Sequence, residues 1–416
     1  MSDLEIAAEN PPLTQEKNPA NAGHQGLRVL LILSALMAFA SISTDLYLPA
    51  MPAIAAAFHA KPGTLELTVT GYLIGFSVGQ LFWGPISDRF GRRLPVALGL
   101  LLFIIGSAGC ALAASTGEMV GWRVVQALGA CANVVLARAM VRDLYQGSQA
   151  ARTMSTLMTI MAIAPLAGPT IGGQILRLWS WQGIFWVLVL IALLTLASLL
   201  LLPETLPKER RSAASPKLII SRYASFFADR RFLAYVATGA FFYAGTFAYI
   251  AASPFAYITY HHVSPQLYGT LFAAGIVGMM ATAQINARYV HRFGIHRMLG
   301  AGALISALAG LLLAVNTWSD WGGLPLMITA CLLFVTATGL VLGNSVAGAL
   351  DCFESFGGSA SALVGALQYG SAMLGSALVA AFADGTPWTL GWVLAVCGIG
   401  CVISAACVSS AERRRL

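Results

Sequence analysis

The chain consists of long apolar stretches separated by short segments that contain charged residues, proline or glycine. A helix needs about 20 predominantly apolar residues to cross the hydrocarbon core of a bilayer. The sequence contains twelve such stretches, and each one predicts a membrane-spanning helix. The approximate spans are 28–50, 67–86, 94–114, 119–141, 153–176 and 182–202 in the first half, and 233–257, 267–290, 296–316, 323–349, 359–381 and 388–409 in the second half.

The composition agrees with a membrane protein, because 58% of the 416 residues are hydrophobic and only 10% are charged. A soluble domain has about 45 to 50% apolar and about 25% charged residues. The longest hydrophilic stretch between spans separates them into six and six, and we interpret it as a linker between two bundles. The expected parts are a tail at 1–27, bundles at 28–202 and 232–410, the linker at 203–231 and a short tail at 411–416.

The two halves of the chain repeat each other weakly. A shift of 202 residues aligns six identical residues of the first span with the seventh, and the tripeptide RFG at 89–91 recurs at 292–294. Equivalent helices then run in the same direction, as in transporters whose halves are related by a pseudo-two-fold axis along the membrane normal. The sequence therefore predicts an all-α membrane protein with two six-helix bundles and a site between them. Chance similarity between apolar segments is the alternative.

The distribution of basic residues predicts the orientation of the chain in the membrane. With both termini inside, all but Lys61, Arg177 and Arg123 of the 24 basic residues lie in cytoplasmic segments or helix ends, as membrane topology requires. The net charge of +7 is explained in this way and predicts no nucleic-acid partner. The polar start of the chain lacks the order of a cleaved signal peptide, so we expect the first helix to stay attached. All seven cysteines fall in or at the ends of spans, where we interpret them as small core residues.

Two ionisable side chains are predicted to lie well inside the membrane. Asp45 is the acidic one and Arg123 the basic one, each five residues from the outer end of its span, or about 8 Å deep. Buried ionisable groups cost about 2.5 to 3.5 kcal/mol and usually face a cavity or a partner. We interpret Asp45 as the proton carrier and Arg123 as the charge whose approach releases the proton. A static ion pair, or an Asp45 that faces outer water beyond Pro49 and Pro52, are the alternatives.

The loop after the second span, GPISDRFGRRLP, combines glycines that permit a tight reversal with arginines that hold the loop inside. We expect it to act as a cytoplasmic gating loop through Gly84, Asp88, Arg89, Gly91, Arg92 and Arg93.

In the fifth span, APLAGPTIGG interrupts the backbone ladder with prolines and offers small residues for close helix approach. A simple kinked packing face is the alternative. The residues concerned are Pro165, Gly168, Pro169, Gly172 and Gly173.

Aromatic residues are concentrated in the seventh span, which suits flat, weakly polar compounds by stacking and burial of apolar area. Lipid-facing and interfacial positions are the alternative for such residues. The candidate substrate-cavity residues are Tyr47, Gln126, Asn133, Tyr243, Phe247, Tyr249, Gln368 and Tyr369.

The whole chain resembles the Bcr/CflA group of drug:proton antiporters within the major facilitator superfamily, the relatives of the bicyclomycin resistance protein. The resemblance rests on STDLYLPAMPAI, GPISDRFGRR, RVVQALGA and GPTIGG. It implies a monomer in the bacterial inner membrane that exports small hydrophobic compounds in exchange for protons by alternating access. Bicyclomycin, chloramphenicol-like phenicols and sulfonamides are the candidate substrates that it implies.

The resemblance also implies roles for individual residues. Arg123 is similar to the arginine associated with proton transfer, and Asp45 to the acid of helix 1 tied to coupling. Asp88 and Arg92 are implied to form a cytoplasmic charge latch with Asp143, which would stabilise the outward-facing state. In the second half His291 replaces the acid, and Ile295 and His296 stand at the positions of the two arginines, so a latch there is expected to be weaker or absent.

Other functions fit the sequence less well. A proton-coupled uptake carrier for a small polar nutrient should carry several charges in its cavity, whereas one acid and one base are predicted here. An enzyme would need clustered metal ligands or a nucleophile with a base, but the six histidines lie outside the predicted hydrocarbon core or at its edge. No GxxxxGK[ST] loop is present, so we expect no ATP drive and an ion gradient as the energy source. The resemblance implies that the ion is the proton, and we expect no cofactor and no metal.

Overall fold

The computed structural model describes residues 19–145, 147–211, 226–353 and 357–413, which form helices and connecting turns without a β-strand in these ranges. Each of the twelve predicted spans coincides with one helix or with two or three consecutive helical elements, which confirms the predicted all-α fold. The first six spans are α1 (Pro19–Asp45) with η1 (Leu48–Ala50) and α2 (Met51–Ala57), α3 (Glu66–Phe90), α4 (Arg93–Leu112), α5 (Thr116–Leu144), α6 (Gly147–Leu178) and α7 (Trp181–Ser198). The last six are α9 (Arg230–Pro254) with η4 (Phe255–Tyr260), α10 (Pro265–Phe293), α11 (Ile295–Ser319), α12 (Gly323–Thr336) with α13 (Thr338–Asp351), α14 (Gly357–Ala381) and α15 (Trp388–Arg413).

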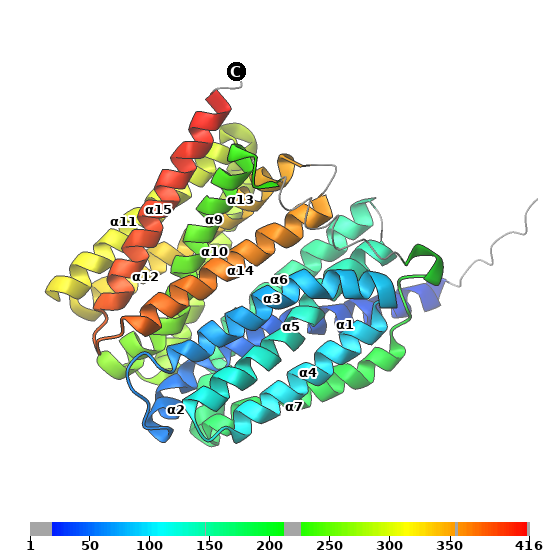
Figure 1. Cartoon of the computed structure of the whole chain (residues 1–416), viewed down its shortest axis with the longest axis horizontal. Coiled ribbons are helices and arrows are strands. Elements are labelled where there is room, and N and C mark those ends of the chain that lie inside the picture. Colours follow the sequence, from blue (N-terminus) through cyan, green and yellow to red (C-terminus); the bar gives the residue numbers. More distant parts are fainter. Residues whose placement is uncertain (1–18, 146, 212–225, 354–356, 414–416) are drawn as a thin grey trace, which may run out of the picture.

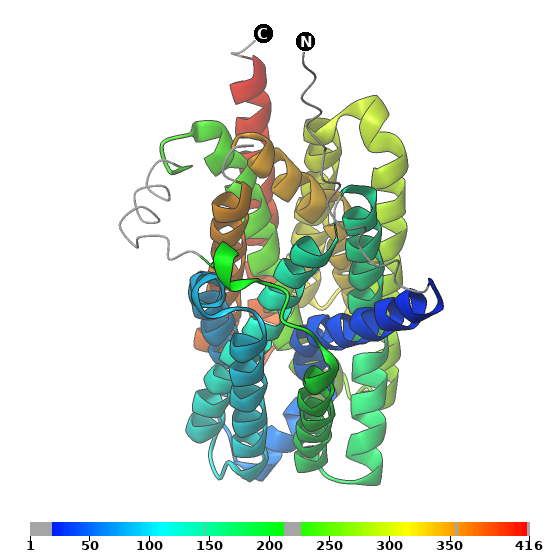
Figure 2. The same cartoon turned by 90° about the vertical axis from the view of Figure 1, so that its right-hand side faces the viewer.

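The helices form two groups, with α1 to α7 in the first and α9 to α15 in the second (Figure 1). Most of the long helices in both groups run along a common direction, as the perpendicular view shows (Figure 2). We call the end with the α3–α4 connection and residues 203–211 the linker end. The far end carries the connections 58–65 and 261–264.

Two helix pairs form the seam between the groups, since α3 packs along α14 and α6 packs along α10. In the first pair, Thr70 and Ser376 share a hydrogen bond of 2.9 Å, and the Ser77 hydroxyl donates to the carbonyl of Ala366 at 3.2 Å. In the second pair, Gly269 of α10 lies against the backbone of Thr170 in α6. The two contacts are equivalent to each other, because α3 and α10 are the second spans of their groups and α6 and α14 are the fifth.

Ten helical segments in the described ranges are long and apolar enough to cross a membrane. The two remaining spans, α3 and α6, are first-group helices of the seam.

The periphery of the molecule carries the apolar surface expected of a membrane protein. Leu194 is 63% exposed, and Leu308 and Leu374 are each 59% exposed. Three exposed tryptophans, Trp179, Trp318 and Trp321, lie at the far end, where indole rings commonly mark the lipid–water boundary. The chain is therefore a multi-pass membrane protein.

The outer bound of the first span and the loop role given to Gly84 were wrong. The first span extends to Ala57 instead of ending at residue 50, and its helix is interrupted after Asp45. Asp45 consequently lies twelve residues before the far end of its span, about 18 Å away if the rise were helical throughout. Gly84 takes no part in the reversal after the second span, because it lies within α3.

Candidate functional site

Arg123 is completely buried in α5, where two polar groups and two aromatic rings surround it. Its Nη1 donates to the backbone carbonyl of Ser43 at 2.9 Å and to Oε1 of Gln126 at 2.7 Å. The guanidinium lies 4.7 Å from the ring centroid of Tyr47 and 4.5 Å from that of Tyr72, so cation–π attraction contributes to holding the charge. Its Nε and Nη2 have no hydrogen-bond partner in the described structure.

Asp45 is the last residue of α1 and is 5% exposed. Its carboxyl group makes no hydrogen bond or ion pair with any described residue. It lies against Gly168 of α6, where an added methyl group would come within 2.7 Å of the Asp45 Cβ, and it is close enough to Tyr268 of α10 to interact electrostatically. Burial and the negative end of the α1 dipole both favour the neutral acid over the carboxylate.

The structure does not bring Asp45 and Arg123 together, so the predicted approach of the two charges is absent in this conformation. The reason lies in the geometry of α1, since residues two apart on a helix point to nearly opposite sides. Ser43 faces α3 and α5, where its hydroxyl bonds the Tyr72 hydroxyl at 2.7 Å. Asp45 faces α6 and the second group. The two groups that were predicted to titrate against each other instead occupy opposite sides of one helix.

The small residues of α6 make the close helix approach that the sequence predicts. Gly168 and Gly172 are buried, and a methyl group at Gly172 would overlap the backbone carbonyl of Leu46, just after Asp45. Gly173 faces Pro265, the first residue of α10, with an added methyl group at 3.3 Å from its carbonyl oxygen. Pro165 and Pro169 lie within α6. This glycine face fixes α6 against both Asp45 and the second group.

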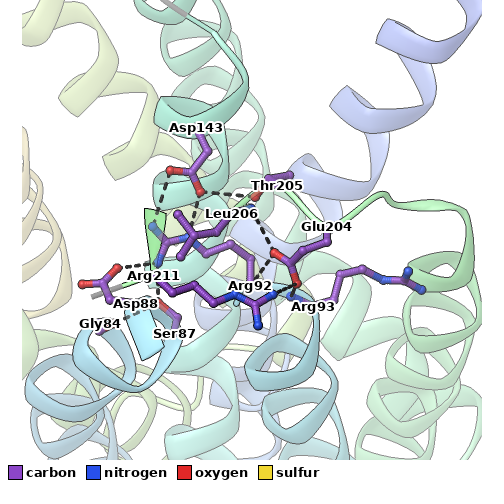
Figure 3. A network of polar contacts seen from close by, with 10 residues as sticks. All are labelled: Gly84, Ser87, Asp88, Arg92, Arg93, Asp143, Glu204, Thr205, Leu206 and Arg211. Atoms are coloured by element: carbon purple, nitrogen blue, oxygen red, sulfur yellow. Dashed lines mark hydrogen bonds and ion pairs between the residues drawn. The ribbon is translucent and has the colours of Figure 1, made fainter. Parts of the chain in front are cut away.

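At the linker end, Arg92 is the centre of a charged network (Figure 3). Its Nη1 donates to Asp88 at 2.7 Å and to the Ser87 hydroxyl at 2.6 Å, and its Nε donates to Asp143 at 2.8 Å. Arg92 is 7% exposed, so these partners hold a nearly buried charge. The structure thus contains the contacts between Asp88, Arg92 and Asp143 that the family resemblance implied.

The start of the linker completes this network, and these linker contacts were not predicted from the sequence. Glu204 accepts hydrogen bonds from the backbone N–H groups of Arg92 at 2.8 Å and Arg93 at 3.2 Å, so it caps the N-terminus of α4 (Figure 3). Thr205 donates to Asp143 at 3.2 Å. Burial raises the pKa of Glu204, but the backbone donors outweigh it, and the pKa is lowered overall. A carboxylate following a span could have been considered as a cap for a neighbouring helix.

The two RFG segments have the same local structure. Gly91 ends α3 with φ of 88° and Gly294 ends α10 with φ of 82°, a region that favours glycine. Arg89 lies over the Phe90 ring at 5.4 Å and Arg292 lies over Phe293 at 5.6 Å. The sequence repeat therefore corresponds to a structural one. At the linker end of the second group, Arg231 pairs with Asp351 at 3.4 Å.

An aromatic cluster crosses the seam near its middle. Tyr369 of α14 lies 4.3 Å from Phe76 of α3, 5.4 Å from Tyr243 and 6.3 Å from Phe247, measured between ring centroids. Its members are buried or half-buried. Arg138 of α5 is half-buried and interacts electrostatically with Tyr243 and Tyr369. The sequence predicts Arg138 at a cytoplasmic helix end, but α5 continues to Leu144.

The other cavity candidates are dispersed. Gln126 and Asn133 are completely buried in α5, the first bridging Arg123 and Ser107, and the second facing Gly99 of α4. Tyr249 stacks on Phe272 at 6.1 Å. Tyr47, beside Arg123, bonds Thr68, and Gln368 lies close to Gly239. In this conformation Gln126 and Asn133 lie within the first group instead of at the seam, and the cavity roles of all these residues stay predictions.

Comparison with known proteins identifies the family. The family model described as Major Facilitator Superfamily matches residues 32–259. The chain belongs to the Major Facilitator Superfamily. Among its superfamily relatives, the bicyclomycin resistance protein homolog of Haemophilus influenzae is 30% identical over 90% of this chain and 94% of the relative. The chloramphenicol resistance protein of Pseudomonas aeruginosa is 30% identical over 90% of each chain.

The MFS-type transporter YdgK of Bacillus subtilis, described as uncharacterized, is 33% identical over 83% of this chain and 86% of that protein. A crystal structure of a D-xylose-proton symporter has a TM-score of 0.74 with 17% sequence identity, and covers 92% of this chain and 97% of its own. At this identity the structural likeness establishes the major facilitator fold alone. The protein is thus a membrane transporter with that fold.

Proposed function

We propose that the protein exports small hydrophobic drugs or antibiotics across the bacterial inner membrane in exchange for protons, and that it works as a monomer. Two of its relatives are named for resistance to bicyclomycin and chloramphenicol, which are therefore the first candidate substrates. Sulfonamides are a further candidate, which the resemblance to the Bcr/CflA group implies. The basic residues of both RFG loops support a linker end that lies in the cytoplasm. Both termini are then cytoplasmic and the far end faces outward.

The proposed proton coupling rests on one observation. Asp45 is a buried acid without a hydrogen-bond partner among the described residues, and it lies beside Tyr268 of the second group. An ionised Asp45 places an uncompensated charge at the α6–α10 seam, whereas a protonated one leaves the seam neutral. The occupancy of Asp45 by a proton therefore biases how the two groups pack, which is what alternating access requires.

Arg123 is assigned a supporting role in this proposal. Its positive charge lies on the opposite side of α1 from Asp45 and bonds the α1 backbone at Ser43. Any rotation or shift of α1 that carries Asp45 away from the seam changes the contacts of Arg123. The two residues are therefore coupled through the helix itself.

The aromatic cluster around Tyr369 supports the assignment of substrate class. Its rings come from α3, α9 and α14, so a flat compound bound there touches both groups. Arg138 supplies a positive charge beside these rings, which favours compounds with a nitro, sulfonyl or carbonyl group as hydrogen-bond acceptor.

Drug accumulation in intact bacteria tests the function. Cells that express the chain should accumulate less chloramphenicol, sulfonamide or bicyclomycin than cells without it, and a protonophore should remove the difference. Accumulation that rises with expression would instead indicate uptake and contradict export.

A further inference from the structure

A second buried acid lies at the seam, on the side opposite Asp45. Glu66 begins α3 at the far end and is 7% exposed. Its carboxylate makes no hydrogen bond or ion pair with another described residue. The backbone N–H of Glu66 itself is the hydrogen-bond donor to the carboxylate. Its carbonyl oxygen is near the Ser376 hydroxyl of α14, at 3.5 Å, which places Glu66 directly at the α3–α14 contact.

Glu66 borders two hollows formed jointly by the two groups. The smaller, of about 20 Å³, is lined by Gly63 of the first group and by Ala252, Val379 and Leu390 of the second. The larger, of about 500 Å³, extends along Met51 and Leu65 to Phe255. The walls are mainly apolar, so they offer little to stabilise a negative charge.

The charged and titratable groups that face Glu66 come from its own group. His59 and Lys61 line the larger hollow, and Tyr47 interacts with Glu66 electrostatically. From the second group, α9, η4, α14 and α15 contribute lining residues without ionisable side chains. Asp384 lies between the lining residues Ala383 and Gly385, where it accepts hydrogen bonds from Thr386.

Closure of the far end therefore has an electrostatic consequence. When the groups separate there, water reaches Glu66 and stabilises the ionised form. When they close, the second group replaces that water with apolar side chains and provides no compensating charge, so the neutral acid is favoured. By linkage, a proton that binds Glu66 more tightly in the closed form shifts the population toward that form.

We propose that Glu66 is a second proton-binding residue of this transporter, which takes up a proton from the outer side as the far end closes and returns it to that side on opening. Asp45 at the α6–α10 seam carries the transported proton, and Glu66 at the α3–α14 seam makes outer closure depend on external acidity. This inference rests on the proposed antiport in one respect only, which is the direction of transport that closure of the far end serves.

A distance measurement without drug tests it. Spin labels at Ser180→Cys and Trp321→Cys, both exposed at the far end in different groups, would report its opening in lipid nanodiscs. The seven native cysteines are replaced first. We expect the wild-type distance distribution to shift toward shorter values as the pH falls from about 8 to about 5, the range open to a buried glutamate.

Glu66→Gln mimics the neutral acid, so its distribution should stay short at both pH values. Glu66→Asp keeps a titrating group and should retain the pH-dependent shift. Glu118→Gln is the matched control. Glu118 is an exposed acid at the same end of the molecule, and its carboxylate caps the start of its own helix. This variant should behave as wild type.

A wild-type distribution that does not change with pH, or a Glu66→Gln variant that shifts as wild type does, would overturn the proposal. Monodisperse elution of each variant guards against misfolding. Because no drug is present, these outcomes are independent of whether drug export itself is demonstrated.

Discussion

Nη1 of Arg123 donates a hydrogen bond to the carbonyl oxygen of Ser43 at 2.9 Å, joining α5 to α1 two residues before Asp45. This contact keeps a buried arginine on one side of α1 while the acid lies on the other. Because α1 is interrupted just after Asp45, the segment that follows Asp45 can change orientation without disturbing the preceding helix. The buried charge of Arg123, the break in α1 and the proton-binding acid Asp45 are therefore neighbours.

Neutralising Arg123 should affect coupling more than stability. Arg123→Gln removes a buried charge whose Nε and Nη2 have no hydrogen-bond partner in the described structure, so we expect thermal stability in detergent to change by less than about 1 kcal/mol. Drug-driven proton release from vesicles should nevertheless be lost. Arg177→Gln, at an exposed arginine, is the control. Normal proton release by Arg123→Gln would remove this residue from the coupling scheme.

The glycine face of α6 should tolerate no added side chain at its closest point. Gly172→Ala forces a methyl group onto the backbone of Leu46, and we expect a loss of about 1 to 3 kcal/mol in thermal unfolding. Gly121→Ala, at a helical glycine of α5 with open space around it, should be neutral or gain up to about 1 kcal/mol. Equal stability of the two variants would show that α6 is not packed in this way.

Arg92 should not be replaceable by lysine. Its guanidinium contacts Asp88 and Asp143 at once, which a single ammonium group cannot reproduce. We expect Arg92→Lys to lower thermal stability by about 1 to 3 kcal/mol and to slow drug export. Arg89→Lys, in the same loop but exposed, should cost less than about 0.5 kcal/mol. A comparable loss in both variants would argue against a specific role for the network.

Acid should weaken the attachment of the linker. The pKa of Glu204 is lowered in the folded protein, so its contribution to stability is fully present above the unfolded value of 4.5 and is lost as the pH falls through the folded value. The difference in melting temperature between wild type and Glu204→Gln should therefore be constant near neutrality and shrink below about pH 4.5. Glu209→Gln, at an exposed acid of the same linker, should show no such difference. A gap that widens in acid would contradict the assignment.

The sequence was sufficient to predict the helices, because the lipid bilayer imposes a similar length and an apolar character on every span. It was less informative about which side chain faces which helix, since lipid and protein interior are both apolar. Depth alone placed Asp45 and Arg123 inside the protein correctly, but it could not show that they lie on opposite sides of α1. Their separation depends on the rotation of α1 about its axis.

Glu66, Arg138 and Glu204 were missed for a related reason. Hydropathy began the second span one residue after Glu66, although α3 starts there, and it ended the fourth span three residues after Arg138, although α5 continues to Leu144. Both acids and the arginine occupy positions where tertiary neighbours, not local sequence, decide whether water is present. Glu204 acts on a helix start more than a hundred residues away along the chain.

Proton release from energised inside-out vesicles tests the central claim most directly. The vesicles are acidified, a quenched dye reports internal acidity, and chloramphenicol, bicyclomycin or a sulfonamide is added to wild type and to Asp45→Asn. We predict that drug drives protons out of wild-type vesicles and not out of Asp45→Asn vesicles, because asparagine retains the shape of the neutral acid but cannot bind a proton. Equal release by the variant would contradict Asp45 as the carrier, and the lack of any drug-driven release in wild type would contradict drug:proton exchange.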